Sequence, residues 1–578
     1  MKNTEIISIF EDIVKILELQ SENLFKIRAY QKVIYSIEKL NTEIFSMYKF
    51  FGIQGLLNIS GVGKSIAEKI EELLNTGHLK YFEELKNSIP NGITNLLEIE
   101  GLGPKKVNLF YEKLGIDNLE KLKKALEEHK IKDLPGMGEK TEENIVKAIS
   151  FYKQQQKRQL LWKALPIAEK IIEDLQKLKE IEKISLAGSL RRMKETIGDI
   201  DILVASLYPE KVMDYFTSLS YVIKILVKGK TKSSILIEQN KQVDLRVVDI
   251  ESFGAALMYF TGSKQHNISL RKLAKEKGLK INEYGLFDKS LEKIAGKTEE
   301  EVFNALGLSY ISPELRENAE EIDLAIKNKL PELITQKDIK GDLHIHSDWS
   351  DGISSIEEIV FVAKAMGYEY IAICDHSASH KIGNGLSRER LLEQIKFIHY
   401  LNEKDKTFYV LSGAEVNIKK DGSLDYDDEI LSQLDLVIAS IHYGFKQEEK
   451  VITNRIVQAM KNKFVNIIAH PTGRLISSRN SYAIDMEKIF EVAFETKTFL
   501  ELNSFPERLD LKDVYLKRAK EKEVMISIGT DAHCKTHLDL IKFGIATARR
   551  GWLEKKNLLN TLSLKNLLEK LKEKQKLN

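Results

Sequence analysis

Residues 188–204 read GSLRRMKETIGDIDILV, a stretch in which a glycine-led turn separates two strand-like segments. Residues 184–187 are predicted as a short buried strand, the Gly-Ser pair as a tight turn, and residues 200–205 as a second strand with period-two alternation. The alternation places Asp199 and Asp201 on one face of the strand. Because neighbouring carboxylates repel each other and are costly to desolvate, this pair predicts a bound cation.

A third acid stands further along, inside the strand-like run QVDLRV. Asp199, Asp201 and Asp244 together offer the hard oxygen ligands of a site for two Mg²⁺ ions, which clamps the attacking and leaving oxygens of a phosphoryl transfer. The Gly-Ser turn and the following Arg191 and Arg192 can offer backbone N–H groups and a guanidinium to a triphosphate. A D-x-D pair by itself is more often a strand cap, but the full combination predicts a nucleotidyl-transfer site.

These motifs resemble the nucleotidyltransferases and, within them, the family X DNA polymerases. The resemblance extends to YFTGS at 259–263 and INEY at 281–284. It implies a catalytic palm over residues 155–254 and a subdomain over 255–318 that closes on the nascent base pair. The residues that it implies in binding the deoxynucleoside triphosphate are Gly188, Ser189, Arg192, Gly198, Arg158, Tyr259, Phe260, Gly262 and Asn267.

Two further positions follow from the same resemblance. Arg271 matches a residue that touches the template strand. Gln242, two residues before Asp244, stands where the resembled family has an arginine near its catalytic acid. Because glutamine cannot supply that charge, we expect the rate or the metal preference of polymerisation to differ.

The composition describes several globular domains. A chain of 578 residues is too long for one core, and about four domains is the expectation. The 88 basic and 86 acidic residues nearly cancel, so a nucleic-acid surface must come from local segregation of charge. Two cysteines without a framework of pairs suggest a reducing compartment, and no signal peptide or membrane span is evident. We expect a cytoplasmic, nucleoid-associated monomer.

The N-terminal residues are predicted as helical, with one domain over 1–88 and a DNA-binding subdomain over 89–154. Three Gly-x-Gly turns between helical segments indicate helix-hairpin-helix motifs, whose glycines let backbone N–H groups approach a DNA phosphate without reading bases. One such turn is weak evidence, whereas three on one chain favour binding of the DNA backbone. The glycines are Gly61, Gly63, Gly101, Gly103, Gly136 and Gly138.

The first hairpin, GVGKSIAEKI, resembles the lyase domain of the family X polymerases. The resemblance implies that Lys69 forms a Schiff base with an abasic sugar, with Lys26 and Tyr30 also at matching positions. Such an amine must be partly deprotonated to attack an aldehyde. The alternative is a surface lysine that binds phosphate, and Ser65 stands where the family's example carries another lysine.

After a predicted linker over 319–337, residues 338–578 change in organisation. Seven strand-like runs alternate with helical segments, which predicts a seven-stranded parallel β/α barrel. The runs are 341–346, 370–375, 408–415, 436–442, 465–470, 499–503 and 524–531. Nine of the 12 histidines follow Gly341, which suggests a second chemistry in this part.

Polar residues gather at the C-terminal ends of these runs, where barrel active sites lie. Imidazole with carboxylate suits Zn²⁺ or Mn²⁺, and nine ligands are enough for up to three ions. The nine candidates are His344, His346, Asp351, His376, Glu415, His442, His470, Asp531 and His533.

This half resembles the polymerase and histidinol phosphatase (PHP) domain through DLHIHSDWSDG, CDHS, GAEV, IHYGF, AHPTGR and TDAH. The order of domains is similar to that of the bacterial and archaeal family X polymerases with a C-terminal PHP domain. The resemblance implies a metal-dependent 3′–5′ exonuclease and, in some members, an abasic-site endonuclease. Asn417 stands where an acid is expected, and Arg474 and Arg508 are candidates for holding a DNA phosphate.

The sequence therefore predicts a repair polymerase that fills short gaps in gapped or primer-template DNA and carries its own nuclease. One alternative keeps the polymerase but makes the barrel a structural zinc module, and the complete ligand set argues against it. A second is a DNA-end-binding scaffold, against which the three palm acids argue. A third, a small-molecule phosphatase fused to a binding module, is disfavoured by the three hairpins.

Overall fold

The computed structural model describes residues 3–20, 22–38, 44–59, 61–90, 92–97, 99, 101–156, 158–238, 241–380, 383–476 and 478–576. The chain forms two compact units, Met1–Lys157 and Arg158–Asn578. No helix among the described residues is both long and apolar enough to span a bilayer.

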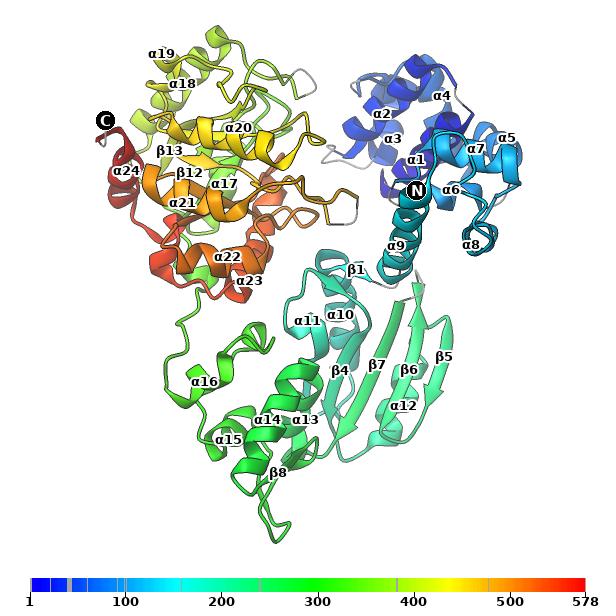
Figure 1. Ribbon diagram of the computed structural model, residues 1–578, viewed down its shortest axis with the longest axis vertical. Helices are drawn as coiled ribbons and strands as arrows, with labels where there is room; N and C mark the ends of the chain where they lie inside the picture. The colour runs from blue at the N-terminus through cyan, green and yellow to red at the C-terminus, as the bar shows by residue number, and fades with distance from the viewer. Residues whose placement is uncertain are drawn as a thin grey trace. The chain divides into compact units, whose positions relative to one another are not determined.

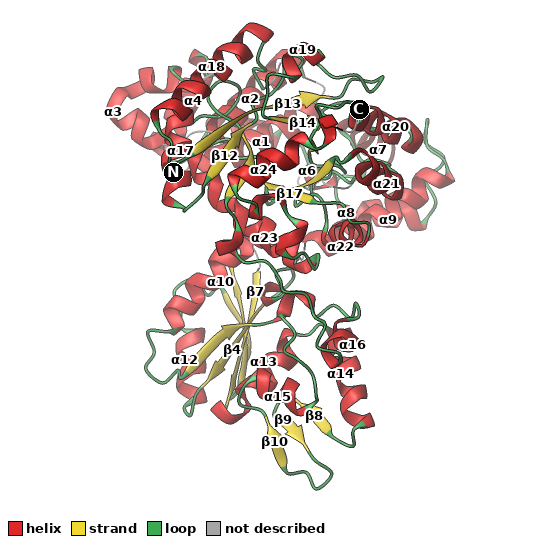
Figure 2. Ribbon diagram, turned by 90° about the vertical axis from the view of Figure 1, so that its left-hand side faces the viewer, coloured by secondary structure: helices red, strands yellow, loops and turns green. Residues whose placement is uncertain are grey.

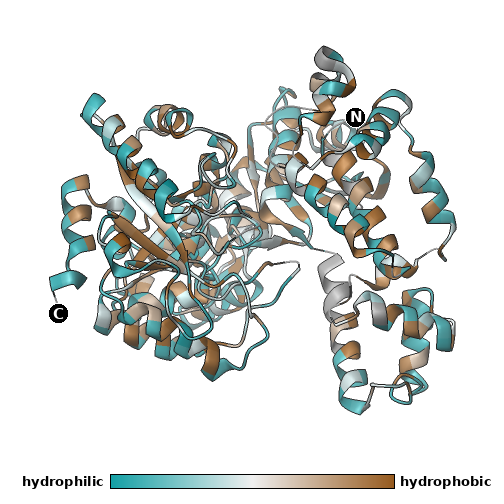
Figure 3. Cartoon of the chain, turned by 90° about the horizontal axis from the view of Figure 1, so that it is seen from above, coloured by the Kyte–Doolittle hydropathy of each residue, from teal (hydrophilic) through white to brown (hydrophobic). Residues whose placement is uncertain are grey.

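The first unit is helical, as predicted (Figure 1). Apolar and polar bands alternate along its helices in Figure 3, and the apolar residues form two separate cores, one around Phe10 and one around Phe110. The helices are α1 (Asn3–Leu19), α2 (Leu24–Glu38), α3 (Ile44–Leu57), α4 (Lys64–Thr76), α5 (Lys80–Asn87), α6 (Ile93–Leu96), α7 (Pro104–Leu114), α8 (Leu119–Glu127) and α9 (Glu139–Gln156).

Each Gly-x-Gly turn in this unit precedes a helix. Gly61, Gly101 and Gly136 have φ angles of 82°, 80° and 76°, in the left-handed region that favours glycine. Gly63 and Gly103 are the N-caps of α4 and α7, and a Cβ added at either would meet nothing within 4 Å. The space beside these two glycines at the helix starts is therefore open.

The second unit begins with a five-stranded sheet. Its strands are, in spatial order, β2 (Lys183–Leu186), β4 (Ile200–Ala205), β7 (Lys241–Val248), β6 (Lys232–Ile237) and β5 (Lys224–Lys228). Strands β4 and β7 are parallel, whereas the other pairs are antiparallel. The apolar sides of α10 (Leu161–Leu175) and α12 (Pro209–Thr217) are buried in the core of this sheet. A short ribbon of β1 (Gln159–Leu160) and β3 (Thr196–Ile197) lies before it.

The prediction of a tight turn at Gly188 is wrong. Residues Gly188–Arg191 form the short helix α11, and the Gly188 carbonyl accepts a hydrogen bond from the Arg192 N–H. A glycine at φ 58° permits the chain to leave β2 and enter this helical turn directly.

A smaller subdomain follows the sheet and has its own core. Its elements are η2 (Ile250–Ser252), α13 (Phe253–Thr261), α14 (Lys264–Glu276), β8 (Lys280–Asn282), β9 (Gly285–Phe287), β10 (Lys293–Ala295), α15 (Glu299–Ala305), η3 (Pro313–Leu315) and α16 (Glu321–Ile326). The stretch predicted as a linker is packed, because Ala325 and Ile334 are fully buried and Leu333 pairs with Glu554.

Residues 341–576 form the predicted seven-stranded barrel, in which each parallel strand pairs with the next along the chain (Figure 2). A parallel bridge from Ile345 to Ala532 joins the first strand to the segment that directly follows the last one. The strands are β11 (Gly341–Ile345), β12 (Tyr370–Ile373), β13 (Tyr409–Asn417), β14 (Leu436–Ser440), β15 (Ile467–Ile468), β16 (Phe499–Asn503) and β17 (Ile526–Gly529).

Alternate barrel residues pack in two different cores. On β12, Ala372 belongs to an inner core with Leu567 and Leu571 of the last α-helix. Its neighbours Ile371 and Ile373 pack instead among the outer helices. The α-helices are α17 (Ile356–Ala365), α18 (Arg388–Lys404), α19 (Asp428–Leu431), α20 (Glu449–Lys461), α21 (Met486–Thr496), α22 (Asp513–Glu521), α23 (Ile541–Arg550) and α24 (Leu564–Lys572). The 3-10 helices are η4 (Gln336–Asp338), η5 (Lys535–Leu540), η6 (Lys555–Asn557), η7 (Leu559–Thr561) and η8 (Lys574–Lys576).

Candidate active sites

A cavity of about 600 Å³ opens beside the acids of the five-stranded sheet. Asp199 and Asp201 line it, and the β4–β7 register places Asp201 directly opposite Asp244. All nine residues that sequence reasoning assigned to nucleotide binding line this cavity, as does Arg271. The structure adds two residues that the assignment omitted, Thr261 and Lys264.

Gly188 approaches Asp201 so closely that no other residue fits. An ideal Cβ on Gly188 would lie 2.0 Å from Asp201 Oδ2, and its φ of 58° is unfavourable for L side chains. Burial, followed by the charges of Asp244 and Asp199, raises the pKa of Asp201 to about 6. A carboxylate with a raised pKa, crowded by two other acids, fits a divalent cation, which would relieve their repulsion.

Asp244 has two partners that offset its charge. Gln242 Nε2 donates a hydrogen bond to Asp244 Oδ1 at 2.8 Å, so this position contributes a hydrogen bond in place of an arginine. A positively charged side chain beside Asp244 comes instead from the neighbouring strand β6, where Lys232 Nζ lies 3.4 Å from Asp244 Oδ2. Sequence reasoning missed Lys232 because it did not predict β6 beside β7.

Arg192, the candidate triphosphate ligand, is already oriented by two contacts. Its Nε donates to Glu317 Oε1 at 3.0 Å, and its NH1 donates to the carbonyl of Thr261. Arg158 is held similarly, since its Nε donates to Thr196 Oγ1 at 2.9 Å.

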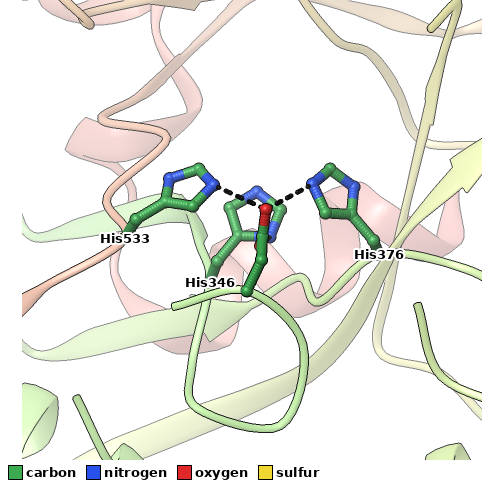
Figure 4. A group of neighbouring side chains, drawn as sticks. His346, His376 and His533 are labelled. Atoms are coloured by element: carbon green, nitrogen blue, oxygen red, sulfur yellow. Dashed lines mark ion pairs between the residues drawn. The ribbon is translucent and has the colours of Figure 1, made fainter. Parts of the chain in front are cut away.

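The nine candidate ligands of the barrel converge at the C-terminal ends of its strands. Eight of them form three groups within which all ligand atoms lie no more than 4.8 Å apart, and one group shares His346 with the second and His376 with the third. The ninth candidate, His470, joins them through Glu415. Figure 4 shows His346, His376 and His533 around one carboxylate, that of Asp351, which lies 3.5 Å from His376 Nε2 and 3.4 Å from His533 Nε2.

Glu415 lies at the centre of the cluster. Its Oε1 lies 3.2 Å from His442 Nε2 and 3.0 Å from His470 Nε2, and its Oε2 lies 2.8 Å from His376 Nδ1. Burial would raise the pKa of this carboxyl, but the surrounding imidazoles, above all those of His442 and His376, lower it well below its usual range. Glu415 is therefore held as an anion at the middle of the site.

The buried donor atoms fit metal ions. His344 Nε2 and His346 Nε2 face each other at 3.1 Å. Among the described residues, His346 Nδ1 and Glu415 Oε2 are buried and have no hydrogen-bond partner. Glu415 Oε2 lies close to His376 Nδ1, but the two atoms do not form a hydrogen bond. Unsatisfied imidazole and carboxylate lone pairs are costly unless a cation accepts them. The donor set suits Zn²⁺ or Mn²⁺.

Residues behind the ligands fix their orientation. Glu501 Oε1 lies 2.6 Å from His344 Nδ1, and Glu501 Oε2 accepts a hydrogen bond from the backbone N–H of His470 at 2.7 Å. Burial would lower the pKa of His344, but the charge of Glu501 and the other carboxylates raises it well above the usual value. His470 and Asp531 have positive φ angles of 29° and 53°, a backbone strain that concentrates at functional sites.

Two residues near the cluster were not predicted, and a third contacts a ligand from behind. Sequence reasoning missed Glu501, although its strand FLELN was predicted, and it missed His380, whose ring lies 4.2 Å from that of His376. Asn417, expected to act behind the ligands, lies with its Oδ1 2.5 Å from His442 Nδ1.

The two arginine candidates differ. Arg474 donates to Glu195 of the sheet subdomain at 2.8 Å and to the Leu509 carbonyl, so it joins the two halves of this unit rather than facing a ligand. Arg508 stays beside the cluster, with its Nε 3.5 Å from Asp531 Oδ2.

In the first unit, Lys69 lies among aromatic rings. Its Nζ is 5.0 Å from the centre of the Tyr81 ring, which stacks on Tyr30 at 6.5 Å, and Lys26 Nζ is 5.4 Å from the same ring. Burial, assisted by the charge of Lys26, lowers the pKa of Lys69 against the opposing effect of Glu68. The motif GVGKSIAEKI gave no indication that Lys69 contacts Tyr81.

Four sequence profiles match the chain. They are described as a helix-hairpin-helix domain over residues 1–79, a SAM-like helix-hairpin-helix tandem over 93–150, a DNA polymerase beta thumb over 256–317 and a PHP domain over 342–505.

Three curated proteins illustrate which parts of the chain are shared. DNA polymerase/3′–5′ exonuclease PolX of Bacillus subtilis (strain 168) is 41% identical over 98% of this chain and 99% of its own length. DNA polymerase lambda of Rattus norvegicus is 25% identical over 54% of this chain and 56% of its own length. A probable phosphatase of Thermoanaerobacter sp. (strain X514) is 30% identical over 41% of this chain and 95% of its own length.

Proposed function

Because the chain belongs to the family X DNA polymerases that carry a C-terminal PHP domain, we propose that it both extends and trims DNA primers. The five-stranded sheet is the palm of the polymerase, and the barrel is the nuclease. The observation that carries the polymerase assignment is the convergence of the acids, the Gly188 turn and the nucleotide-binding candidates on one cavity.

At the palm, Asp199, Asp201 and Asp244 would hold two Mg²⁺ ions, which, when bound, lower the pKa of the primer hydroxyl and offset charge on the leaving pyrophosphate. The N–H groups at the start of α11 and the Arg192 guanidinium bind the triphosphate. Tyr259 and Phe260, whose rings meet edge to face at 5.1 Å, pack against the incoming sugar.

At the barrel, the eight grouped residues together with His470 would hold up to three Zn²⁺ or Mn²⁺ ions, which supply an activated water and neutralise charge on a phosphoester. Glu501 keeps His344 and His470 in their ligand geometry. Arg508, which lies beside Asp531, would hold the DNA phosphate. The reaction is hydrolysis at a DNA 3′ end, and an abasic-site endonuclease uses the same centre.

The first unit binds the DNA backbone through its three glycine turns, which suits gapped DNA of any sequence. Within it, Lys69 would be the imine-forming amine of a lyase for abasic sugars, which is supported by its lowered pKa in a partly buried position beside Lys26. Short-gap filling in base excision repair uses all three activities.

An end-labelled duplex with a short gap tests the proposal. Incubated with the protein and Mg²⁺ or Mn²⁺, its primer should lengthen when nucleotides are present and shorten when they are absent. Extension without any shortening, on 3′ ends, abasic sites and 3′ phosphates alike, would favour a structural metal in the barrel. Binding without either reaction would favour a DNA-end scaffold.

A further inference from the structure

Helix α23 of the barrel domain contacts Arg192 of the nucleotide pocket through one arginine, Arg550. The side chain of Arg550 is only 6% exposed, and one of its nitrogens, NH1, donates to two acceptors. These are the backbone carbonyl of Arg192, at 2.9 Å, and Glu317 Oε1, at 3.2 Å. Its NH2 is fixed by Asp513 Oδ2 at 2.5 Å, which sets the plane of the guanidinium.

Both acceptors of Arg550 position Arg192. Glu317 Oε1 is the same atom that accepts from Arg192 Nε, so Arg550 holds the carboxylate that orients the Arg192 side chain. The other acceptor is the main chain of Arg192 itself. Arg550 therefore restrains Arg192 at its backbone and, through Glu317, at its guanidinium.

We propose that Arg550 is a positioning residue for polymerisation, through which the barrel holds Arg192 ready to bind the triphosphate. The inference rests on the proposed polymerase function and on Arg192 as a nucleotide ligand. The physical reason is preorganisation: a ligand arginine that is already oriented loses less rotamer freedom when it binds. Removing Arg550 should therefore weaken nucleotide binding, although Arg550 itself is not one of the residues that line the cavity.

The neighbouring Arg549 supplies a matched control. It lies on the same helix and also ties the barrel to the preceding subdomain, since its Nε donates to Glu314 Oε1 and its NH1 to the Ile334 carbonyl, each at 2.7 Å. These contacts do not involve Arg192. Loss of Arg549 weakens the same interface without releasing the nucleotide ligand.

The test measures single-nucleotide gap filling by the full chain over a range of nucleotide concentrations. In Arg550→Ala, the KM for the nucleotide should rise about fivefold or more, a typical size for coupling between sites, while the KM for DNA stays unchanged. In Arg549→Ala, the nucleotide KM should stay within about twofold of wild type. Arg550→Lys should not rescue the KM, because an ammonium cannot reproduce the planar fork.

Glu317→Gln gives a second test that keeps the Arg550–Asp513 pair intact. It should also raise the nucleotide KM. The double variant Glu317→Gln/Arg550→Ala should raise it by less than the product of the two single effects, because each single variant already loses the contact between Arg550 and Glu317. Barrel hydrolysis of a 3′ end should be normal in every variant.

Equal nucleotide KM values for the two alanine variants, or an unchanged KM in Glu317→Gln, would overturn the proposal. An absence of extension by the wild type would instead refute the polymerase assignment, so the two failures are distinguishable.

Discussion

Replacing Asp201 by asparagine should stabilise the metal-free protein while abolishing primer extension. Burial and the two neighbouring acids raise the pKa of Asp201 from 3.8 to about 6. An acid whose pKa is raised by folding destabilises the native state once it ionises, so its penalty is absent below about pH 4 and complete above pH 6. Two pKa units correspond to about 3 kcal/mol at pH 8 and to roughly half of that at pH 5.

Urea unfolding in the presence of a chelator measures this penalty. Asp201→Asn should be more stable than wild type at pH 8, by up to about 3 kcal/mol, and the gain should shrink at pH 5. Asp214→Asn, at an acid whose side chain is 70% exposed, is the control and should change stability by less than about 0.5 kcal/mol. Mg²⁺ should narrow the gap, because it binds only the wild-type acid cluster. A variant that gains nothing, or gains equally at both pH values, would refute the reasoning.

Three further predictions concern single residues. Gly188→Ala should lose extension, because its Cβ would lie 2.0 Å from Asp201 Oδ2, whereas Gly367→Ala, with a φ of 81° but nothing within 4 Å, should leave extension intact. Extension at the wild-type rate in Gly188→Ala would contradict the close approach. Lys69→Ala should abolish borohydride trapping of the protein on a nicked abasic site, and undiminished trapping would assign the imine to another lysine. His344→Ala should lose 3′ hydrolysis together with bound metal, measured by elemental analysis, and full metal content in the variant would remove this histidine from the ligand set.

The barrel and its cluster were largely predictable from sequence. Each strand of a parallel barrel is buried on both faces and reads as a short apolar run, and its polar residues collect at one end. The seven runs and the fold that they predict are confirmed, and the nine ligand candidates lie together. The roles of these residues stay predictions.

What sequence reasoning missed depends on contacts between distant segments. Lys232 reaches Asp244 only because β6 pairs with β7, and Glu501 reaches His344 across the barrel. Residues 319–337 were predicted as a linker, yet packing buries Ile334. The helical turn at Gly188 was expected as a tight turn because a single glycine does not distinguish the two.

The central claim is that one chain holds two independent active sites. The most direct test follows one end-labelled gapped duplex with wild type, Asp201→Ala and His344→Ala, with and without nucleotides. We predict that Asp201→Ala shortens the primer but never extends it, and that His344→Ala extends the primer but never shortens it. Loss of both reactions in either folded variant would contradict the account.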